Sequence, residues 1–587
     1  MRSWAPILLS AAGLAPALVA QTSVSLEPSV ASPAAVGTLV TWTATVSDGA
    51  NPGTLWYRFI IRGFDPRPRI VKDFGPDNSF RWAAGEAEGF YAIEVRVRNR
   101  DTGEQMEAVA PFQVVSNVTS GQPVAKTTSH PLVWLYSAPP CPLGASMFVY
   151  FQAAGVEPGT ADALHRTPAK QCNGLFSMNF HIAGIRPATP YHVKHVIERN
   201  SLFSEGPVLQ FTSGEAPDHL PVHTVSEGSF TSSNQRVFLA GSLFTNFVAT
   251  DLEGNLIWYY PEVITFLTRP EPGGYFFGIN EDESGDQSKQ IVRMFDLEGI
   301  TVFETNAARV NEQLTAAGKR PINAFHHEAR RLSNGHILVL AGVEQIMQNV
   351  QGSDSANILA DMIIVLNRNL EVVWTWDAFD HLDVQRAATM DDMCTPGVCP
   401  PLFLAPEAKD WLHSNSVAET PDGNLLLSIR SQDWVIKIDY QNGQGSGNVL
   451  WRLGKDGDFR IDSSDPDLWF SHQHDAEYES DGTLTIFDNS NVRQAANPEA
   501  NSRGQVYRLD EQNRVAELVM NADLGYYAFA LGSAQRLENG NYLFDAGFLL
   551  DGAGISLETD ANGNTVHAIK SSAPEYRTFR LKDMYTP

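Results

Sequence analysis

The sequence predicts an all-β protein, a six-bladed β-propeller preceded by two small β-sandwich domains. Gly supplies 45 and Pro 34 of the 587 residues, which suits short strands and turns better than long helices. Strand-like runs fill the N-terminal third, and a turn-and-strand unit repeats from about residue 225 onward. Because 587 residues exceed what one hydrophobic core usually serves, several domains are expected.

The first 20 residues have the pattern of an export signal. Arg2 provides a basic start, residues 4–14 are mostly apolar, and small residues such as Ala17 and Ala20 follow. No later run reaches the roughly 18 apolar residues that a membrane span needs. We therefore expect an exported chain, periplasmic or secreted, without a membrane span.

Residues 21–116 are predicted to form an immunoglobulin-like β-sandwich. Alternating apolar residues at 39–46, 55–61 and 90–97 predict strands, and Gly, Pro, Asn and Asp residues separate them. No recognisable reactive set accompanies these strands. A supporting or attachment module is the expectation.

Residues 117–214 are predicted to form a fibronectin III-like β-sandwich. The stretch Gly184–Tyr191 places a Pro-containing corner before a late strand, and residues 208–212 form a short closing strand. The Tyr191 hydroxyl is expected to bond to the backbone just upstream of it.

Four cysteines fit an oxidising compartment. Cys394 and Cys399 flank a short turn, and Cys141 and Cys172 share one N-terminal region, so local pairing gives two disulfides. Free thiols are the alternative, and a Cys-x4-Cys pair also suits zinc, although no second pair completes such a site.

Residues 215–587 carry the repeat. Hairpin signals recur along it, and two hairpins per roughly 40 to 60 residues are what a four-stranded blade needs. About six such units can be counted. A turn glycine precedes an apolar strand at 334–340, 422–427, 481–487 and 539–544, and further hairpins are predicted at 251–258, 296–303, 367–374 and 510–515. A pair of additional sandwiches is the alternative architecture.

The formal net charge of −26 argues against nucleic acid or an anionic membrane as a partner, because both favour clustered Lys and Arg. An anionic small-molecule substrate would need a locally positive site that is shielded from the negative electrostatic potential of the whole chain. Assembly as a homo-oligomer stays open.

Counting back from the turn glycines of successive units compares equivalent positions. His327, Asn415 and His474 lie eight residues before the glycine, and His413 and His472 lie ten before it. Residues two apart on a strand point to one side, so we expect imidazoles from several blades to meet at one mouth of the axial channel.

Arg430 ends an apolar strand in the same unit as His413. Taken alone, it is equally an arginine solvated at an outer edge. Beside imidazoles, its planar guanidinium suits the oxygens of a sulfate or phosphate.

At these residues the chain resembles the bacterial aryl sulfotransferase family, exported six-bladed propellers that follow a β-sandwich. The resemblance covers roughly 320–550 and rests on HHEARRLSNGHIL from His326, DWLHSNS from Asp410, the strand ending in Arg430, WRLG from Trp451 and QHDA from Gln473. It implies a transferase that moves a sulfuryl group from an aryl sulfate to a phenolic acceptor without a nucleotide sulfate donor, and we expect no cofactor.

The resemblance also implies roles for individual residues. His474 is the histidine that is transiently sulfated, and His327, His413, Asn415 and Arg430 hold sulfuryl oxygens and manage the phenolic proton. His326 and His472 are added candidates for substrate binding. Ser533 stands near the position of a threonine expected in the last blade, and Asp475 follows His474 where well-described members carry a small hydroxyl residue.

Two other functions stay open. A metal-dependent lyase or hydrolase would use His-x-His with His327 and His413 as ligands of a divalent ion. A non-catalytic extracellular binding protein would use the domains only to present surfaces, which leaves the repeated histidines unexplained.

Overall fold

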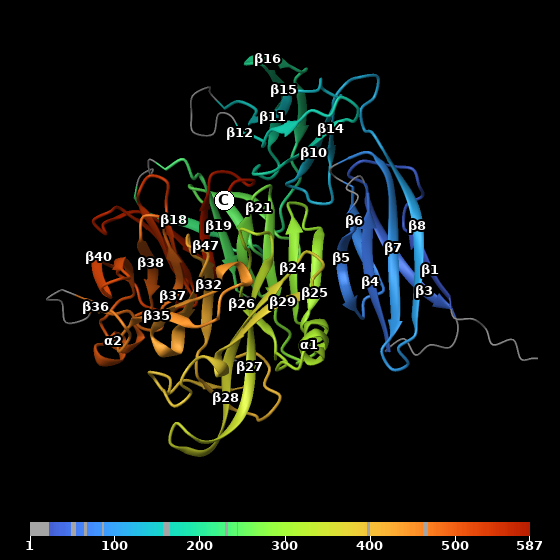
Figure 1. Ribbon diagram of the computed structural model, residues 1–587. Coiled ribbons are helices and arrows are strands. Elements are labelled where there is room, and N and C mark those ends of the chain that lie inside the picture. The colour runs from blue at the N-terminus through green and yellow to red at the C-terminus, as the bar shows by residue number, and fades with distance from the viewer. Residues whose placement is uncertain are drawn as a thin grey trace, which may run out of the picture.

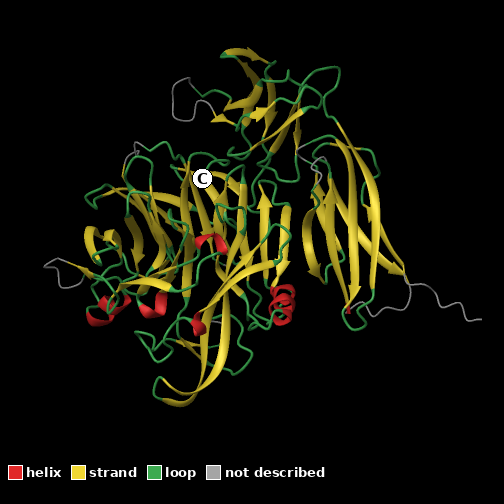
Figure 2. Cartoon of the chain, viewed as in Figure 1, coloured by secondary structure: helices red, strands yellow, loops and turns green. Residues whose placement is uncertain are grey.

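The computed structural model confirms an all-β chain with few helices (Figures 1 and 2). It describes residues 23–47, 54–63, 67–84, 87–156, 165–228, 233–243, 245–395, 399–461 and 468–587. The predicted export signal, residues 1–20, lies outside them. Across these ranges, no helix has the length and apolar character needed to cross a membrane.

The N-terminal part forms two facing sheets, at the right of Figure 1. One sheet contains β1 (Ser23–Pro28), β3 (Leu39–Ser47) and β6 (Ser79–Ala83), and the other contains β2 (Ala34–Ala35), β8 (Gln105–Val115), β7 (Gly89–Asn99), β4 (Leu55–Arg62) and β5 (Arg69–Gly75). The three strands predicted here are confirmed. Alternate apolar residues, including Trp42, Phe59 and Val95, point into a shared core.

A second pair of sheets follows, at the top of Figure 1. It comprises β9 (Val124–Thr127), β10 (Trp134–Ala138) and β14 (Met178–Ile182), and on the other side β11 (Ser146–Ala153), β12 (His165–Arg166), β13 (Lys170–Gln171), β15 (Pro190–Arg199), β16 (Leu202–Glu205) and β17 (Leu209–Thr212). The Tyr191 hydroxyl accepts a hydrogen bond from the Arg186 amide at 2.9 Å, as the corner motif predicts. The Cys141–Cys172 disulfide is also confirmed.

The rest of the chain forms six groups of at least four paired strands, which we call the six-group region. One of them continues into the N-terminal sheet of β5, because β25 (Thr301–Asn306) pairs with β5 in parallel and makes one nine-stranded sheet. The first three groups are β47 (Glu575–Leu581), β19 (Val237–Ser242), β20 (Val248–Asp251) and β21 (Leu256–Tyr259); β22 (Phe266–Glu271), β23 (Tyr275–Asn280), β24 (Ile291–Asp296) and β25; and β26 (Phe325–Arg331), β27 (Ile337–Val350), β28 (Ser353–Leu366) and β29 (Val372–Asp377) with β31 (Ala408–Asp410) and β30 (Met393–Cys394).

The other three are β32 (Ser414–Glu419), β33 (Leu425–Ile429), β34 (Trp434–Ile438) and β35 (Val449–Gly454); β37 (His474–Tyr478), β38 (Thr483–Asp488), β39 (Arg503–Asp510) and β40 (Val515–Asp523) with β36 (Arg460–Ile461); and β42 (Ser533–Arg536), β43 (Tyr542–Ala546), β45 (Gly554–Thr559), β46 (Thr565–Ser571) and β18 (His223–Gly228). Strands β41 (Ala528–Ala530) and β44 (Phe548–Leu549) pair separately.

Helical segments are short. They are α1 (Ala307–Ala316), α2 (Asn491–Ala496) and 3₁₀ turns at Ala378–Asp380, Arg430–Gln432 and Gln441–Gly443. The helix α1 begins at Asn306, whose side chain accepts a hydrogen bond from the Arg309 amide.

One terminal strand of each group, which we call its inner strand, neighbours the inner strand of the next group. The inner strands are β22, β26, β32, β37, β42 and β47; each lies beside the next in this order, and β47 lies beside β22. Their first residues meet at one end, where the Phe266 ring packs 5.2 Å from His327 and 4.7 Å from Tyr576. Both ends of this region complete sheets, because β18 pairs with β46 and β47 pairs with β19.

All eight predicted hairpins are confirmed. In six of them a turn glycine adopts a left-handed φ angle that other residues rarely accept, for example 82° at Gly335 and 79° at Gly423. In the other two, Leu370 and Arg514 take this conformation, with φ angles of 60° and 55°. The local backbone requirements of these turns are therefore enough to predict the hairpins.

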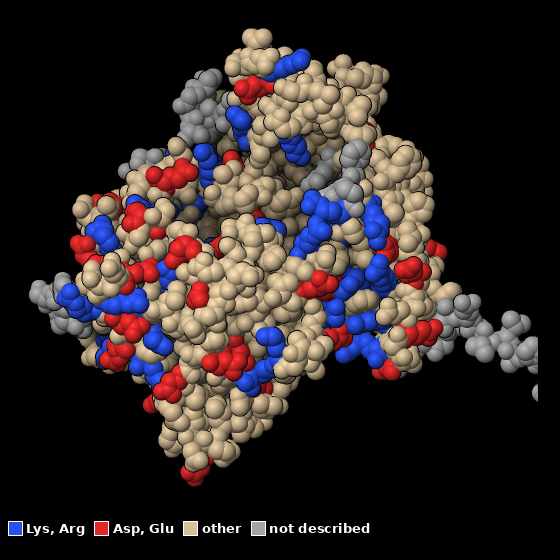
Figure 3. All heavy atoms as spheres, viewed as in Figure 1, with Lys and Arg blue, Asp and Glu red and all other residues tan. Residues whose placement is uncertain are grey.

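Ion pairs join the N-terminal sheets to the six-group region. Arg98 binds Glu312 at 2.6 Å, and Arg186 binds Asp251 at 2.6 Å. Basic side chains gather where the N-terminal sheets meet the rest of the molecule, whereas the two signs mix elsewhere on this face (Figure 3). Arginines of the N-terminal sheets also pair with carboxylates there, as Arg58 does with Asp73.

Candidate active site

Three histidines with left-handed backbone conformations lie in or just before the first residues of three inner strands. His327 and His413 have left-handed φ angles of 57° and 51°, and His472 has one of 54°. The pairing of β26 with β27 shifts register between Phe325 and Ala329, around His327. Such irregular positions re-aim a side chain and are frequent at functional sites.

Three histidines from two inner strands lie in contact. The Nδ1 atoms of His326 and His327 are 3.0 Å apart, and the ring centroids of His327 and His413 are 5.2 Å apart. The Tyr576 hydroxyl donates to the His327 carbonyl at 2.6 Å, which ties β26 to β47. His326 is further occupied by Asp361, 3.2 Å from its Nε2.

His474 is held in one tautomer. Its Nδ1 lies 2.7 Å from Oδ1 of Asn489, and the Nδ2 group of Asn489 donates to the carbonyls of Ala528 and Leu531 at 2.9 and 3.0 Å. The amide orientation is therefore fixed with its oxygen toward the ring, so Nδ1 carries the proton. The unshared electron pair of His474 is on Nε2.

Burial keeps His474 and His327 neutral. Burial and the nearby charge of Arg430 lower the pKa of His474 to about 3. Burial, reinforced by His326, His413 and His474, also holds the pKa of His327 well below its usual value. These imidazoles are neutral at physiological pH, and a neutral imidazole is the form that attacks an electrophile.

Arg430 and His472 share a carboxylate. Asp392 lies 3.2 Å from Nη1 of Arg430 and 3.1 Å from Nε2 of His472, whose Nδ1 lies 3.1 Å from Asp433. Although burial opposes it, hydrogen bonds from His472 and Arg430 lower the pKa of Asp392 to about 2. Bonds to Asp392 and Asp433 outweigh burial and raise the pKa of His472.

His413 is oriented by Asp410. Its Nδ1 lies 2.5 Å from Oδ2 of Asp410, and its side chain keeps 22% of its surface exposed, the most open imidazole of the group. Asp410 belongs to β31, which pairs with β30, and the confirmed Cys394–Cys399 disulfide starts from the last residue of β30. The Nε2 edge of the His413 ring remains available to a ligand.

Two further predicted residues are engaged in links between strands. The Asn415 side chain donates to the Gln473 carbonyl at 2.7 Å and accepts from the Asp475 amide, which joins β32 to β37. The Ser533 hydroxyl donates to the Thr578 carbonyl at 3.1 Å and accepts from the Thr578 amide, which joins β42 to β47.

A buried charge network lies between the inner strands. Arg269 is 2.6 Å from Asp475 and 2.9 Å from Glu328, and Arg577 is 3.0 Å from Glu328. The charges of Arg269 and Arg577 overcome burial and lower the pKa of Asp475. Asp475 thus has a structural ion-pair environment, although it directly follows His474.

Several contributors to this site were absent from the sequence prediction. They are Asp392, Asp410, Asp433, Asn489 and Tyr576, which act on the predicted residues from other segments. A signal existed for Asp410, three residues before His413, and for Asn489 within FDNSN. No spacing links Asp392 or Tyr576 to the histidines, because only the folded sheets bring them together.

Metal-ligand geometry appears away from the histidines. Within the described ranges, three ligand atoms of His, Cys, Asp or Glu side chains gather within 4.8 Å of one another only at Cys394, Cys399 and Asp410. Both of those sulfurs belong to the disulfide. The predicted His-x-His pair is spread over different partners, since His472 faces carboxylates and His474 faces Asn489.

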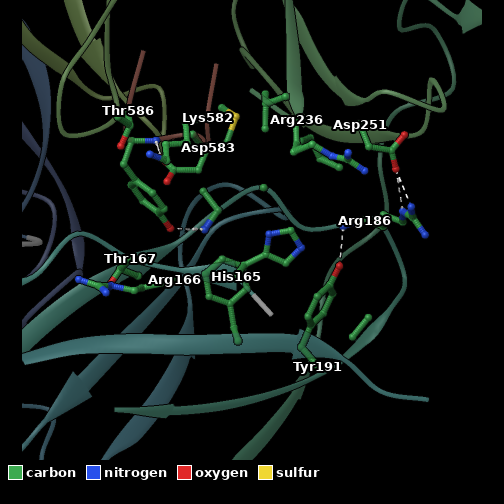
Figure 4. A pocket seen from close by; sticks show the side chains of 18 of the residues that line it. His165, Arg166, Thr167, Arg186, Tyr191, Arg236, Asp251, Lys582, Asp583 and Thr586 are labelled. Atoms are coloured by element: carbon green, nitrogen blue, oxygen red, sulfur yellow. Dashed lines mark hydrogen bonds and ion pairs between the residues drawn. The ribbon is translucent and has the colours of Figure 1, made fainter. Parts of the chain in front are cut away.

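A cavity of about 570 Å³ lies between the second pair of sheets and the six-group region (Figure 4). Tyr191, His165 and Arg166 line one side, and Arg236 and Lys582 line the other. None of the residues of the histidine cluster lines this cavity.

Comparison with known proteins relates residues 222–578 to the family described as Arylsulfotransferase (ASST), whose model they match. Arylsulfate sulfotransferase AssT of Escherichia coli O6:H1 is 24% identical over 327 residues, a match that covers 46% of this chain and 51% of the relative. The match thus spans about half the length of that curated relative.

Two solved structures each match about a third of the chain. The chicken interferon gamma receptor alpha chain covers 33% of it and is itself 98% covered, with 8% identity and a TM-score of 0.13. A two-domain fibronectin type III segment of chicken tenascin covers 33%, is itself 98% covered, and has 13% identity and a TM-score of 0.14.

Proposed function

Because this chain belongs to the arylsulfotransferase family, we propose that it transfers a sulfuryl group from an aryl sulfate to a phenolic acceptor through a sulfohistidine at His474. The bond between His474 and Asn489 carries this proposal. It leaves Nε2 with an electron pair, and the low pKa of His474 keeps that pair unprotonated at neutral pH.

The transfer proceeds in two steps that share one site. Nε2 of His474 attacks sulfur, the bond from sulfur to the aryl oxygen breaks, and the first phenol leaves. The oxygen of the second phenol then attacks the same sulfur, and the electron pair of the nitrogen–sulfur bond returns to Nε2. Such a division replaces one difficult displacement with two easier ones.

Arg430 and His413 bind the sulfuryl oxygens. After burial, the positive charge of Arg430 is the main cause of the lowered pKa of His474, so Arg430 lies near this imidazole. Donors held in place before the reaction stabilise charge as it develops, and removing one such donor costs about 10²- to 10³-fold in rate elsewhere. His327 lines the same space, packed between Phe266 and His413.

The other predicted residues position this set. His472 holds Asp392 against Arg430, His326 packs on His327, and Asn415 and Ser533 fix neighbouring inner strands. Their contacts support indirect roles, because their polar atoms already have partners within the protein.

The proposal includes the architecture. The cyclic order of inner strands supports a six-bladed propeller over residues 215–587, preceded by an immunoglobulin-like sandwich at 21–116 and a fibronectin III-like sandwich at 117–214. Two disulfides support an oxidising compartment, in line with export directed by residues 1–20.

Mass spectrometry after brief mixing with 4-nitrophenyl sulfate tests the nucleophile. A gain of one sulfuryl group on the peptide that contains His474, with a burst of 4-nitrophenol, is expected. His474→Ala should abolish both, whereas His219→Ala, which alters an exposed histidine, should leave both unchanged. A full burst from His474→Ala would refute the proposal.

A further inference from the structure

Neighbouring residues in the chain place Glu281 at the end of the inner strands where the histidines lie. It directly follows β23, and its amide donates to the Thr265 hydroxyl at 3.0 Å, just before β22. Phe266, the next residue after Thr265, packs against His327. The Glu281 carboxyl therefore lies at the same end of the inner strands as the histidines.

One oxygen of the Glu281 carboxyl group has no hydrogen-bond partner in the described residues. This oxygen, Oε1, is buried. Buried polar atoms are nearly always satisfied, so an unpaired one calls for a reason such as a ligand or a catalytic task. His326 and His413 are the basic groups close enough to act on it, and Glu283 is the acidic one.

The charge state of Glu281 suits proton exchange. Burial raises its pKa to about 7, and the opposing influence of His326 and His413 only limits this rise. A general acid or base works best when its pKa is near the operating pH, because both forms are then populated.

The order of the inner strands puts Glu281 opposite the nucleophile. In the cycle β22, β26, β32, β37, β42, β47, the strand β22 stands three places from β37 in either direction. His474 begins β37, and Glu281 is bonded to the residue before β22. In an in-line displacement the attacking atom and the departing oxygen lie on opposite sides of the transferred group.

We propose that Glu281 is the general acid and base for the aryl oxygen, an inference that rests on the proposed function. When the bond from sulfur to the aryl oxygen breaks, the electron pair goes to that oxygen and the Glu281 carboxylic acid gives it a proton. In the second step the acceptor phenol returns a proton to the Glu281 carboxylate as its oxygen attacks sulfur. Glu281 ends each cycle protonated, as it began.

The histidines are less suited to this task. His474 is occupied as the nucleophile, and His327 lacks the pKa needed to release and recover a proton near neutrality. His413 binds Asp410 through Nδ1 and lies beside the transferred group, on the strand next to β37. Proton donation from across the cycle requires a group on the β22 side.

Rapid-mixing release of phenols from a series of phenyl sulfates tests the inference. Glu281→Gln should slow release of a weakly basic phenol such as 4-nitrophenol by no more than about threefold, because that leaving group needs little proton assistance. It should slow release of a strongly basic phenol such as 4-methylphenol by about 10²- to 10⁴-fold. Glu107→Gln, which alters an exposed carboxylate in β8, is the matched control and should follow the wild type.

The outcomes separate the two proposals. A steeper dependence of rate on the pKa of the leaving phenol, with formate restoring Glu281→Ala, supports the assignment. Equal losses for all donors, or an unchanged dependence, overturn it while sulfation of His474 still stands. If the wild type forms no sulfohistidine, both proposals fall. Should Glu281→Gln fail to fold, Glu281→Asp provides the same comparison.

Discussion

The Nδ1 nitrogen of His474 and the Oδ1 oxygen of Asn489 lie 2.7 Å apart, and the amide of Asn489 is locked by two backbone carbonyls on its other side. This relationship sets which nitrogen of His474 has the unshared electron pair and, under the proposed function, which nitrogen attacks sulfur. A residue that contacts neither donor nor acceptor thereby controls the chemistry through the tautomer of its neighbour.

We predict that Asn489→Asp makes sulfation of His474 strongly dependent on pH. A carboxylate beside Nδ1 favours the imidazolium and raises the pKa of His474, so Nε2 carries a proton at low pH. The burst rate should fall about tenfold for each pH unit below the new pKa, because only the neutral fraction reacts. Burst kinetics between pH 5 and pH 9 measure this, and a profile like that of the wild type would contradict it.

The low pKa of His474 also predicts a loss of stability in acid. In the unfolded chain the imidazole takes up a proton near its ordinary pKa of about 6.5. In the folded chain its pKa is about 3, so the folded state binds fewer protons between these values. The free energy of unfolding should therefore fall with pH over this window, by at most about 1.4 kcal/mol per unit from this residue.

Urea unfolding at a series of pH values tests this contribution. His474→Gln cannot titrate, so its free energy of unfolding should change less steeply between pH 6.5 and 3 than that of the wild type. His130 and His223 also have pKa values lowered to about 4, and they add the same slope to both proteins. Parallel curves for the two proteins would count against the assigned pKa.

Asp410→Asn is expected to slow sulfuryl transfer by about 10²-fold or more without unfolding the chain. The 2.5 Å contact orients His413. An asparagine amide at position 410 can turn either its oxygen or its NH2 group toward Nδ1, so it no longer fixes the tautomer of His413. Steady-state rates and circular dichroism provide the measurement. Asp101→Asn, at an exposed position between β7 and β8, serves as the control. An unchanged rate for Asp410→Asn would exclude an orienting role.

Asp475→Ser should destabilise the fold by about 3 to 5 kcal/mol. Removing one partner from a buried ion pair leaves the others uncompensated, and Arg269 and Arg577 are both buried. Denaturant unfolding measures the cost, which Asp475→Asn should lessen by keeping a hydrogen-bond acceptor for Arg269. A change below about 1 kcal/mol would show that the network does not depend on this charge.

Local chemistry explains what could be predicted from the sequence. The strand at 55–61, the corner at Tyr191 and the hairpin at Gly335 each depend on a few adjacent residues, and their patterns are legible without a fold. The histidines were found because repeated units place them at equivalent positions. These are short-range or periodic signals.

The partners of those histidines could not be predicted in the same way. Asp392 reaches His472 across 80 residues, and Tyr576 reaches His327 across 249. No periodicity connects such pairs, since they depend on how whole sheets stand around a common centre. Glu281 was missed for a further reason: its interest lies in a missing partner, which no sequence pattern displays.

The pairing of β47 with β19 has a consequence for synthesis. Arg577 contacts Thr268, 309 residues earlier, and Tyr576 supports the His327 backbone. A nascent chain that still lacks β47 therefore has most of its sheets, but it lacks the strand that supports the histidine cluster. Sulfuryl transfer should begin only once this late strand has been made and docked, so incomplete chains released from the ribosome would be inert.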